Sequence, residues 1–339
     1  MLEKRILYVG NKLSRKGITV TSIETLGRFL ESEGIVVYTA SSIKNKAFRL
    51  LDMIFKTFKY SRKIDYVLID TYSTQNFYYA VTIGNVCRLL KVPYIPILRG
   101  GDLPKRLKKS PSQSKKLFHG AKVNVAPSNY LLKSIIDAGF QNTLCIPNTI
   151  VIDKYPFKKR NGVIPKLLWV RSFAEIYNPF LAIQIIERIS KLYPVATLCM
   201  VGPDKDGSLA KCKAYALHKN LPVTFTGKLN KEEWINLSFK YDIFINTTNF
   251  DNTPVSVIEA MALGLPVIST NVGGVPFLLD NRKDALLVPA NNTEAFVEAI
   301  VSLCSNDALC KSLIKNARNK VEGYDWQIVK HLWLKLFKE

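Results

Sequence analysis

Residues 241–276 read YDIFINTTNFDNTPVSVIEAMALGLPVISTNVGGVP, and this stretch decides the fold. A short apolar run ends in a polar loop, a helical pattern follows at 257–263, and Gly264 and Pro266 end it before a β-rich run at 267–270. The order strand, loop, helix, strand is typical of a parallel α/β sheet. We therefore expect the loop to lie at the carboxyl edge of such a sheet, where α/β proteins bind phosphates.

Two carboxylates flank the predicted start of this helix. Asp251 lies in the loop, and Glu259 lies eight positions further along, inside the helix. An anion held by the free N–H groups of the helix start would lie between them, and each carboxylate could accept hydrogen bonds from hydroxyl groups on its own side. A phosphate flanked by two polyols describes a nucleotide sugar. The alternative is that Glu259 is only the partner of Ser256 in a capping box.

The same stretch resembles the signature of the retaining family 4 glycosyltransferases of the GT-B fold. That signature has two carboxylates separated by seven residues, followed by Glu-Ala-Met-Ala-x-Gly-x-Pro-Val. Residues 259–267, EAMALGLPV, match its second half, and Gly273 and Gly274 follow as in the family. Asp251 stands where the family usually has Glu. The resemblance implies an α/β protein with two Rossmann-like domains that face each other across a cleft.

Length and composition agree with two domains. At 339 residues and 47% hydrophobic, the chain can bury two ordinary cores. The resemblance places an acceptor-side domain at 1–160 and a nucleotide-sugar domain at 161–324, with a terminal helix at 325–339 that packs back on the first domain. The polar and basic stretch 151–164 is the expected linker.

The net charge of +21 is unevenly distributed. Residues 1–165 carry 28 Lys and Arg against 10 Asp and Glu, whereas residues 166–339 carry 20 against 17. A uniformly lysine-rich chain would not show this asymmetry. It indicates a basic face on the first half, directed at phosphates of lipid, nucleic acid or an anionic substrate.

Residues 47–63 form an amphipathic helical pattern bordered by cations. One interpretation is a helix that covers the sheet with its apolar stripe in the core. The other is an interfacial helix whose aromatic side chains enter an anionic bilayer, and a second basic run at 105–116 adds to it. The stripe consists of Phe48, Leu51, Ile54, Phe55 and Phe58.

Polar residues follow two predicted strands of the first half. Arg99 stands where many relatives in the resembling family have an active-site histidine, and it is expected to bind a donor phosphate or an acidic acceptor. The alternative is a salt bridge from Arg99 to Asp102 that shapes the loop. The residues that the resemblance assigns to the acceptor side are Gly17, Tyr72, Ser73 and Asp102.

The second half departs from the family at one point. The family has Gly-Arg-Leu, three residues and then Lys; here Ser172 occupies the Arg position and Tyr177 the Lys position. Arg171 is the remaining candidate for the diphosphate, and Lys228 could supply a second charge. The donor-binding set is Arg171, Ser172, Gly202, Lys228, Asn252, Thr253, Pro254, Val255, Ser256 and Glu259.

The resemblance implies that the chain moves a sugar from a nucleoside-diphosphate sugar to a hydroxyl with retention, as a hexosyltransferase. Asp251, Arg99 and Arg171 are the expected catalytic residues, with Asp251 on the sugar hydroxyls and Glu259 on the ribose. A UDP-sugar is favoured over a GDP-sugar. No His/Cys cluster occurs in the sequence, so neither a catalytic metal nor another cofactor is expected.

We expect a glycan or lipid-linked acceptor, in bacterial cell-surface polysaccharide or glycolipid synthesis. No window holds 18 uncharged apolar residues and the six cysteines are scattered, which favours the cytoplasm. The basic half suggests peripheral contact with the anionic inner face of the membrane. A non-catalytic protein that binds nucleotide sugar or anionic lipid is the alternative. Nucleic-acid binding would give a steep salt dependence, but no recognition motif supports it.

Overall fold

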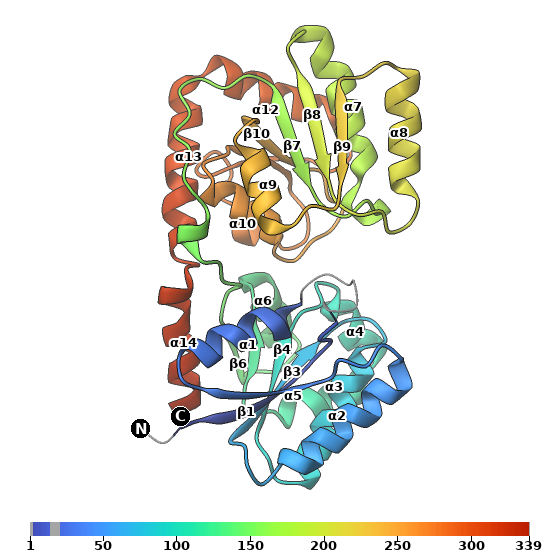
Figure 1. Cartoon of the computed structure of the whole chain (residues 1–339), viewed down its shortest axis with the longest axis vertical. Coiled ribbons are helices and arrows are strands. Elements are labelled where there is room, and N and C mark those ends of the chain that lie inside the picture. The colour runs from blue at the N-terminus through green and yellow to red at the C-terminus, as the bar shows by residue number, and fades with distance from the viewer. Residues whose placement is uncertain (1–2, 14–20, 339) are drawn as a thin grey trace. The chain divides into compact units, whose positions relative to one another are not determined.

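The computed structural model describes residues 3–13 and 21–338 of the chain, which divides into two compact units. Unit 1 runs to Pro147 and also takes in the chain from Val329 onward; unit 2 is Asn148–Ile328. Each unit contains a six-stranded parallel sheet with helices around it (Figure 1). This is the predicted α/β class, with two Rossmann-like domains, and it is confirmed.

Unit 1 has the strand order β2-β1-β3-β4-β5-β6. Its strands are β1 Arg5–Val9, β2 Val36–Ala40, β3 Tyr66–Thr71, β4 Tyr94–Leu98, β5 Asn124–Ala126 and β6 Thr143–Cys145. Its helices are α1 Ser22–Ser32, α2 Lys46–Tyr60, α3 Phe77–Leu89, α4 Leu103–Lys109, α5 Pro111–His119 and α6 Asn129–Asp137. Every residue of β3 and β4 is buried, as expected for central strands covered on both faces.

Unit 2 has the strand order β12-β11-β10-β7-β8-β9. Its strands are β7 Lys166–Val170, β8 Thr197–Val201, β9 Val223–Gly227, β10 Ile243–Asn246, β11 Val267–Thr270 and β12 Leu286–Val288. Its α-helices are α7 Pro179–Leu192, α8 Ser208–His218, α9 Lys231–Ser238, α10 Val255–Ala262, α11 Val275–Leu278, α12 Thr293–Ser305 and α13 Asp307–Glu322. Two short 3₁₀ turns are η2 Ile152–Lys154 and η3 Glu175–Tyr177.

The unit 2 sheet separates two apolar clusters. Leu167 and Trp169 belong to one cluster and Leu168 to the other, because successive side chains of a strand point to opposite faces. Helices α7 and α12 cover the first face, and α10 lies on the second. The strand ends that carry the predicted site therefore meet at one edge of a sheet that is buried on both sides.

The expected linker at 151–164 is instead packed into unit 2. Arg160 is buried, and its guanidinium donates to the carbonyls of Leu263 and Tyr241, each at 3.1 Å. The backbone N–H of Lys158 also donates to the Leu263 carbonyl, at 3.2 Å. A polar and basic composition predicted a linker, but the Arg160 guanidinium and the Lys158 N–H satisfy carbonyls at the end of α10 and before β10.

The last helix, α14 Trp326–Lys338, begins in unit 2 and contributes its residues from Val329 onward to unit 1. Lys330 forms an ion pair with Glu33 of unit 1 at 3.3 Å, and the ring of Phe337 lies 5.7 Å from that of Tyr66. Val329 and Trp333 are buried.

Helix α2 does not place its apolar stripe in the core. Its buried residues are Arg49, Met53 and Thr57, whereas Phe48 and Phe55 are more than 60% exposed. The interpretation of 47–63 as a helix that covers the sheet with its aromatic side is therefore wrong. Periodicity defines an apolar face but does not say which face turns inward.

Candidate functional site

The loop that follows β10 leads directly into α10, at the carboxyl edge of the unit 2 sheet. Pro254, in extended conformation, is the N-cap residue, and the helix runs from Val255 to Ala262. Its residues from Ser256 onward are buried, so the helix is fixed in place. The helix start aims its backbone N–H groups and the positive end of the dipole at the loop 247–254.

The predicted capping box is not formed. Pro254 occupies the cap position, which places Ser256 inside the first turn, and no side chain caps the helix. Thr253 Oγ1 and Ser256 Oγ are buried atoms that have no hydrogen-bond partner among residues 3–13 and 21–338. Two unsatisfied hydroxyls at a helix start are suited to an acceptor supplied from outside the chain, because burying them unpaired costs free energy.

Two glycines after β11 let the loop lie against this turn. Gly274 N donates to the carbonyl of Asp251 at 2.8 Å, and a Cβ at Gly274 would lie 2.0 Å from the carbonyl oxygen of Asn252. Gly273 has φ of +55°, and its Cβ would lie 2.4 Å from the Asp251 oxygen. Only glycine permits this approach of two backbones.

Arg171 and Asp251, both predicted site residues, contact each other. The Arg171 guanidinium forms an ion pair with the Asp251 carboxylate, and their side chains are 20% and 12% exposed. It also lies 4.3 Å from the centre of the Tyr177 ring, a cation–π distance. Burial lowers the pKa of Arg171 from its usual value, while Tyr177 and Glu259 oppose that effect. Tyr177, at the position of the family lysine, therefore stabilises the charged guanidinium with the face of its ring.

Gly202 positions the backbone of Arg171. It follows β8, has φ of +152°, and a Cβ there would lie 1.7 Å from the Arg171 carbonyl oxygen. The N–H of Arg171 donates to the carbonyl of Val201 at 3.0 Å. The role of Gly202 is thus to let two neighbouring strand ends meet.

Glu259 is buried within α10, five residues after the cap residue Pro254. It accepts a hydrogen bond from the Tyr155 hydroxyl at 2.7 Å and forms an ion pair with Lys231. Burial, followed by the charge of Glu259, raises the pKa of Tyr155 well above its usual value. Neither of these two partners of Glu259 was predicted from the sequence. Lys231 could have been singled out in the sequence, because it lies shortly after the end of β9. No sequence pattern pointed to Tyr155.

The other predicted donor residues lie along the same sheet edge. Ser172 follows Arg171 and is half-buried, and Lys228 follows β9 and is exposed. Asn252 is buried, and its N–H donates to the Asp251 carboxylate at 2.8 Å. Val255 is 37% exposed at the first helical position.

In unit 1 the ends of β1, β3 and β4 bring together a buried polar cluster. Asp70 accepts hydrogen bonds from the Tyr8 hydroxyl at 2.9 Å and from Arg99 Nε at 3.2 Å. Burial raises the pKa of Asp70, although Arg99 and Tyr8 act in the opposite direction. The predicted alternative, a salt bridge from Arg99 to Asp102, is wrong: Arg99 pairs with Asp70 at 3.2 Å, and Asp102 pairs with Lys105 at 3.3 Å.

Two of the predicted acceptor-side residues, Tyr72 and Ser73, follow β3 and lie near this cluster. Burial raises the pKa of the Tyr72 hydroxyl, with the charge of Asp70 adding to the effect. Ser73 is partly buried, and a Cβ at Gly100 would lie 2.3 Å from its backbone nitrogen. Gly17 lies outside the residues that the structure describes. Asp70 and Tyr8 were not singled out in the sequence, although Asp70 ends an apolar strand.

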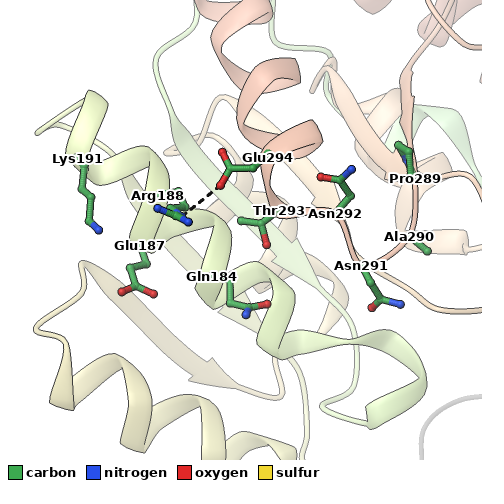
Figure 2. Close-up of a pocket in the computed structure, with 10 residues that line it drawn as sticks. All are labelled: Gln184, Glu187, Arg188, Lys191, Pro289, Ala290, Asn291, Asn292, Thr293 and Glu294. Carbon is green, nitrogen blue, oxygen red and sulfur yellow. Dashed lines mark ion pairs between the residues drawn. The ribbon is translucent and has the colours of Figure 1, made fainter.

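A separate open depression of about 730 Å³ lies between α7 and the start of α12 (Figure 2). Arg188 and Glu294 form an exposed ion pair across it at 3.3 Å. None of the predicted site residues lines it. Its lining residues are Gln184, Glu187, Arg188, Lys191, Pro289, Ala290, Asn291, Asn292, Thr293 and Glu294.

Over residues 3–13 and 21–338, no three His, Cys, Asp or Glu side chains are grouped so that they could hold a metal ion. In the same part of the chain, no helix combines the length and the apolar character needed to cross a bilayer.

Residues 153–320 match the family described as glycosyl transferases group 1. The sulfoquinovosyl transferase SQD2 of Arabidopsis thaliana is 26% identical over 43% of this chain and 28% of its own length. The N,N'-diacetylbacillosaminyl-diphospho-undecaprenol alpha-1,3-N-acetylgalactosaminyltransferase of Campylobacter jejuni is 26% identical over 55% of this chain and 45% of its own. In each case the chain spans less than half of the relative's length.

Solved structures share the fold over nearly the whole chain. Anabaena Alr3699/HepE, in complex with UDP and glucose, superposes with a TM-score of 0.76 at 14% identity, covering 99% of this chain and 100% of that one. The sucrose-phosphate synthase of Thermosynechococcus elongatus gives 0.79 at 16% identity, covering 99% and 98%. The chain therefore has the GT-B fold, and its residues 153–320 form a domain of the glycosyl transferases group 1 type.

Proposed function

We propose that the chain transfers a sugar from a nucleoside-diphosphate sugar to a hydroxyl of an acceptor, with retention and without a metal, as a hexosyltransferase. The observation that carries the proposal is the start of α10, where Asp251, paired with Arg171, precedes the helix and the buried Glu259 lies within it. A diphosphate on the backbone N–H groups of this turn would meet the positive end of the helix dipole.

Each neighbouring residue then has a role in donor binding. The backbone from Asn252 to Ser256 holds phosphate and sugar oxygens, Glu259 accepts hydrogen bonds from the ribose, and Asp251 accepts them from the sugar hydroxyls. Arg171 faces the charge that develops on the departing diphosphate. Stabilising that charge in a preorganised, mostly buried site is the main catalytic effect that this arrangement can supply.

Arg99 is proposed to act from unit 1, on an acidic group of the acceptor or on a donor phosphate. Asp70 and Tyr8 accept hydrogen bonds from its guanidinium, and the Arg99 side chain is 12% exposed. Tyr72, Ser73 and Asp102, together with Gly17, complete the proposed acceptor side.

We favour a UDP-sugar over a GDP-sugar as the donor, because Alr3699/HepE is described in complex with UDP and with UDP-glucose. The acceptor would be a glycan or a lipid-linked glycan in cell-surface polysaccharide or glycolipid synthesis, since the Campylobacter jejuni relative is named for a diphospho-undecaprenol acceptor. Such a reaction would take place in the cytoplasm, at the inner face of the membrane, without nucleic acid.

Thermal unfolding with a panel of nucleotide sugars tests donor binding first, because a ligand at a hundred times its Kd adds about 2.7 kcal/mol to the unfolding free energy. Release of the nucleoside diphosphate then tests turnover, for the wild type and for Asp251→Asn and Arg171→Ala. Arg188→Ala, in the exposed pair of Figure 2, is the control. Full activity in both site variants would place the reaction elsewhere, and binding without turnover would favour the non-catalytic alternative.

A further inference from the structure

Helix α2 carries four large apolar side chains that face solvent. Their positions, three or four residues apart, put them on one side of the helix, and we call them the α2 stripe. The stripe consists of Phe48 (63% exposed), Leu51 (59%), Phe55 (62%) and Phe58 (46%). A continuous row of aromatic and aliphatic side chains is unusual on a free surface and marks an interaction site.

The rotation of α2 is fixed by its opposite face. The Arg49 side chain is buried and donates to the carbonyls of Ile43 and Lys44, each at 2.7 Å, and to Asn11 Oδ1 at 2.9 Å. Met53 belongs to the core of unit 1. Turning the stripe inward would leave a guanidinium and three acceptors without their partners, so the exposure of the stripe is built into the fold.

The border of the stripe is cationic. The only carboxylate between residues 44 and 63 is Asp52, which is mostly buried and pairs with Lys56 at 3.1 Å. The exposed charged residues of this segment are Lys44, Lys46, Lys59, Arg62 and Lys63.

Neighbouring helices of unit 1 also expose apolar and cationic side chains. Helix α2 contacts α3, which in turn contacts α5. The Tyr79 hydroxyl of α3 donates to the Lys46 carbonyl of α2 at 3.1 Å. Helix α3 exposes Leu89, and α5 exposes Lys115 and Lys116.

We propose that the α2 stripe inserts into the interfacial region of an anionic lipid bilayer, with the bordering cations on the lipid phosphates. Aromatic side chains on one side of a helix and Lys and Arg beside them are the two components of interfacial binding. A second copy of the chain would bury the same apolar area, but it would bring two sets of like charges together. The proposal concerns this surface alone and does not depend on the donor chemistry of unit 2.

Sedimentation of the full chain with vesicles tests the proposal without any nucleotide sugar. We expect binding to vesicles that contain phosphatidylglycerol, and binding at least about tenfold weaker to pure phosphatidylcholine, because the lipid charge contributes directly. Phe48→Ser with Phe55→Ser should weaken binding by at least about tenfold, since apolar area is removed. The matched control is Leu192→Ser with Leu217→Ser, at two exposed apolar positions of unit 2. The unfolding temperature of each variant checks that it folds.

Two further measurements separate insertion from other causes. In the Phe55→Trp variant, the added fluorescence should shift to shorter wavelength on vesicles and be quenched by brominated acyl chains. Replacing Lys59, Arg62 and Lys63 by Gln should weaken binding and reduce its salt dependence. Unchanged vesicle binding by the serine variant would overturn the proposal. Self-association that needs the stripe, without any vesicle binding, would overturn it in favour of a second copy.

Discussion

Arg171 and Asp251 form an ion pair at the carboxyl edge of the unit 2 sheet, joining the loops that follow the neighbouring strands β7 and β10. Both side chains are mostly buried, so each charge depends on the other while no anion is bound. A diphosphate would give the guanidinium a new partner and free the carboxylate to accept hydrogen bonds from sugar hydroxyls. The pair thus links the stability of the free protein to the binding of its proposed donor.

Asp251→Asn should lower both the unfolding free energy and the rate of sugar transfer. The substitution leaves the Arg171 charge unpaired in a mostly buried place, which should cost about 2–4 kcal/mol of unfolding free energy. We expect donor to restore part of this loss, because its phosphates would pair with Arg171. Urea unfolding with and without a UDP-sugar measures both effects. Asp251→Glu, which keeps the charge and matches the residue usual in the family, should stay within about tenfold of wild-type activity. Equal stability of the Asn and Glu variants would contradict this account.

Glu259→Gln should affect donor binding more than turnover. It removes the charge that is proposed to bind the ribose but can still accept from the Tyr155 hydroxyl. We expect KM for the donor to rise about tenfold or more, with a smaller change in kcat. Steady-state kinetics at varied donor concentration measures this. Tyr155→Phe serves as the comparison, because it removes one hydrogen bond and should cost about 0.5–1.5 kcal/mol of stability. An unchanged KM in Glu259→Gln would remove the ribose assignment.

Gly274→Ala should disrupt the site through the backbone. The new methyl group would lie against the Asn252 carbonyl oxygen and push the loop away from its hydrogen bond to Asp251. We expect a loss of about 1–3 kcal/mol in unfolding free energy, typical of forced overpacking, together with weaker donor binding. Thermal unfolding measures the first and titration with UDP the second. Gly27→Ala is the control, because neither glycine has a positive φ and a Cβ at Gly27 would meet only Val37 Cγ1, at an ordinary 3.9 Å.

Asp70 should give unit 1 a specific pH dependence. Burial raises its pKa above the ordinary value of 3.8, so the folded state takes up this proton before the unfolded state does as pH falls. The Asp70 contribution to stability therefore decreases as pH rises from about 4 through the folded pKa, and it is constant above that pKa. The difference in unfolding free energy between wild type and Asp70→Asn should fall over this range. Urea unfolding at several pH values measures it, and a difference that rises with pH would show a lowered pKa.

Local patterns in the sequence predicted the helix start near Pro254, the turn at Gly273 and Gly274, and the order of strands and helices. These features depend on neighbouring residues, which a single sequence displays directly. The sequence could not show that Pro254, rather than Ser256, takes the cap position. Nor could it show that Tyr155 meets Glu259, because that contact is made only when the segment before β7 packs on α10.

The sequence left the orientation of α2 undecided for a similar reason. The apolar periodicity of α2 is clear, but the hydrogen bonds of Arg49 to Ile43, Lys44 and Asn11 determine which face of the helix is buried. These three acceptors come together only in the folded unit. Of the two interpretations of this pattern, the one that placed the apolar stripe in the core relied on the burial of apolar area, which is usually the larger effect. Here a buried guanidinium with three satisfied donors decides the rotation.

The return of helix α14 to unit 1 sets a constraint on how the protein is made. Val329, Trp333 and Phe337 belong to unit 1, although the rest of that unit is translated first. Unit 1 must therefore wait with part of its core uncovered while the ribosome completes all of unit 2. A premature stop before Val329 would therefore leave unit 1 incomplete, although most of that unit is encoded at the other end of the gene.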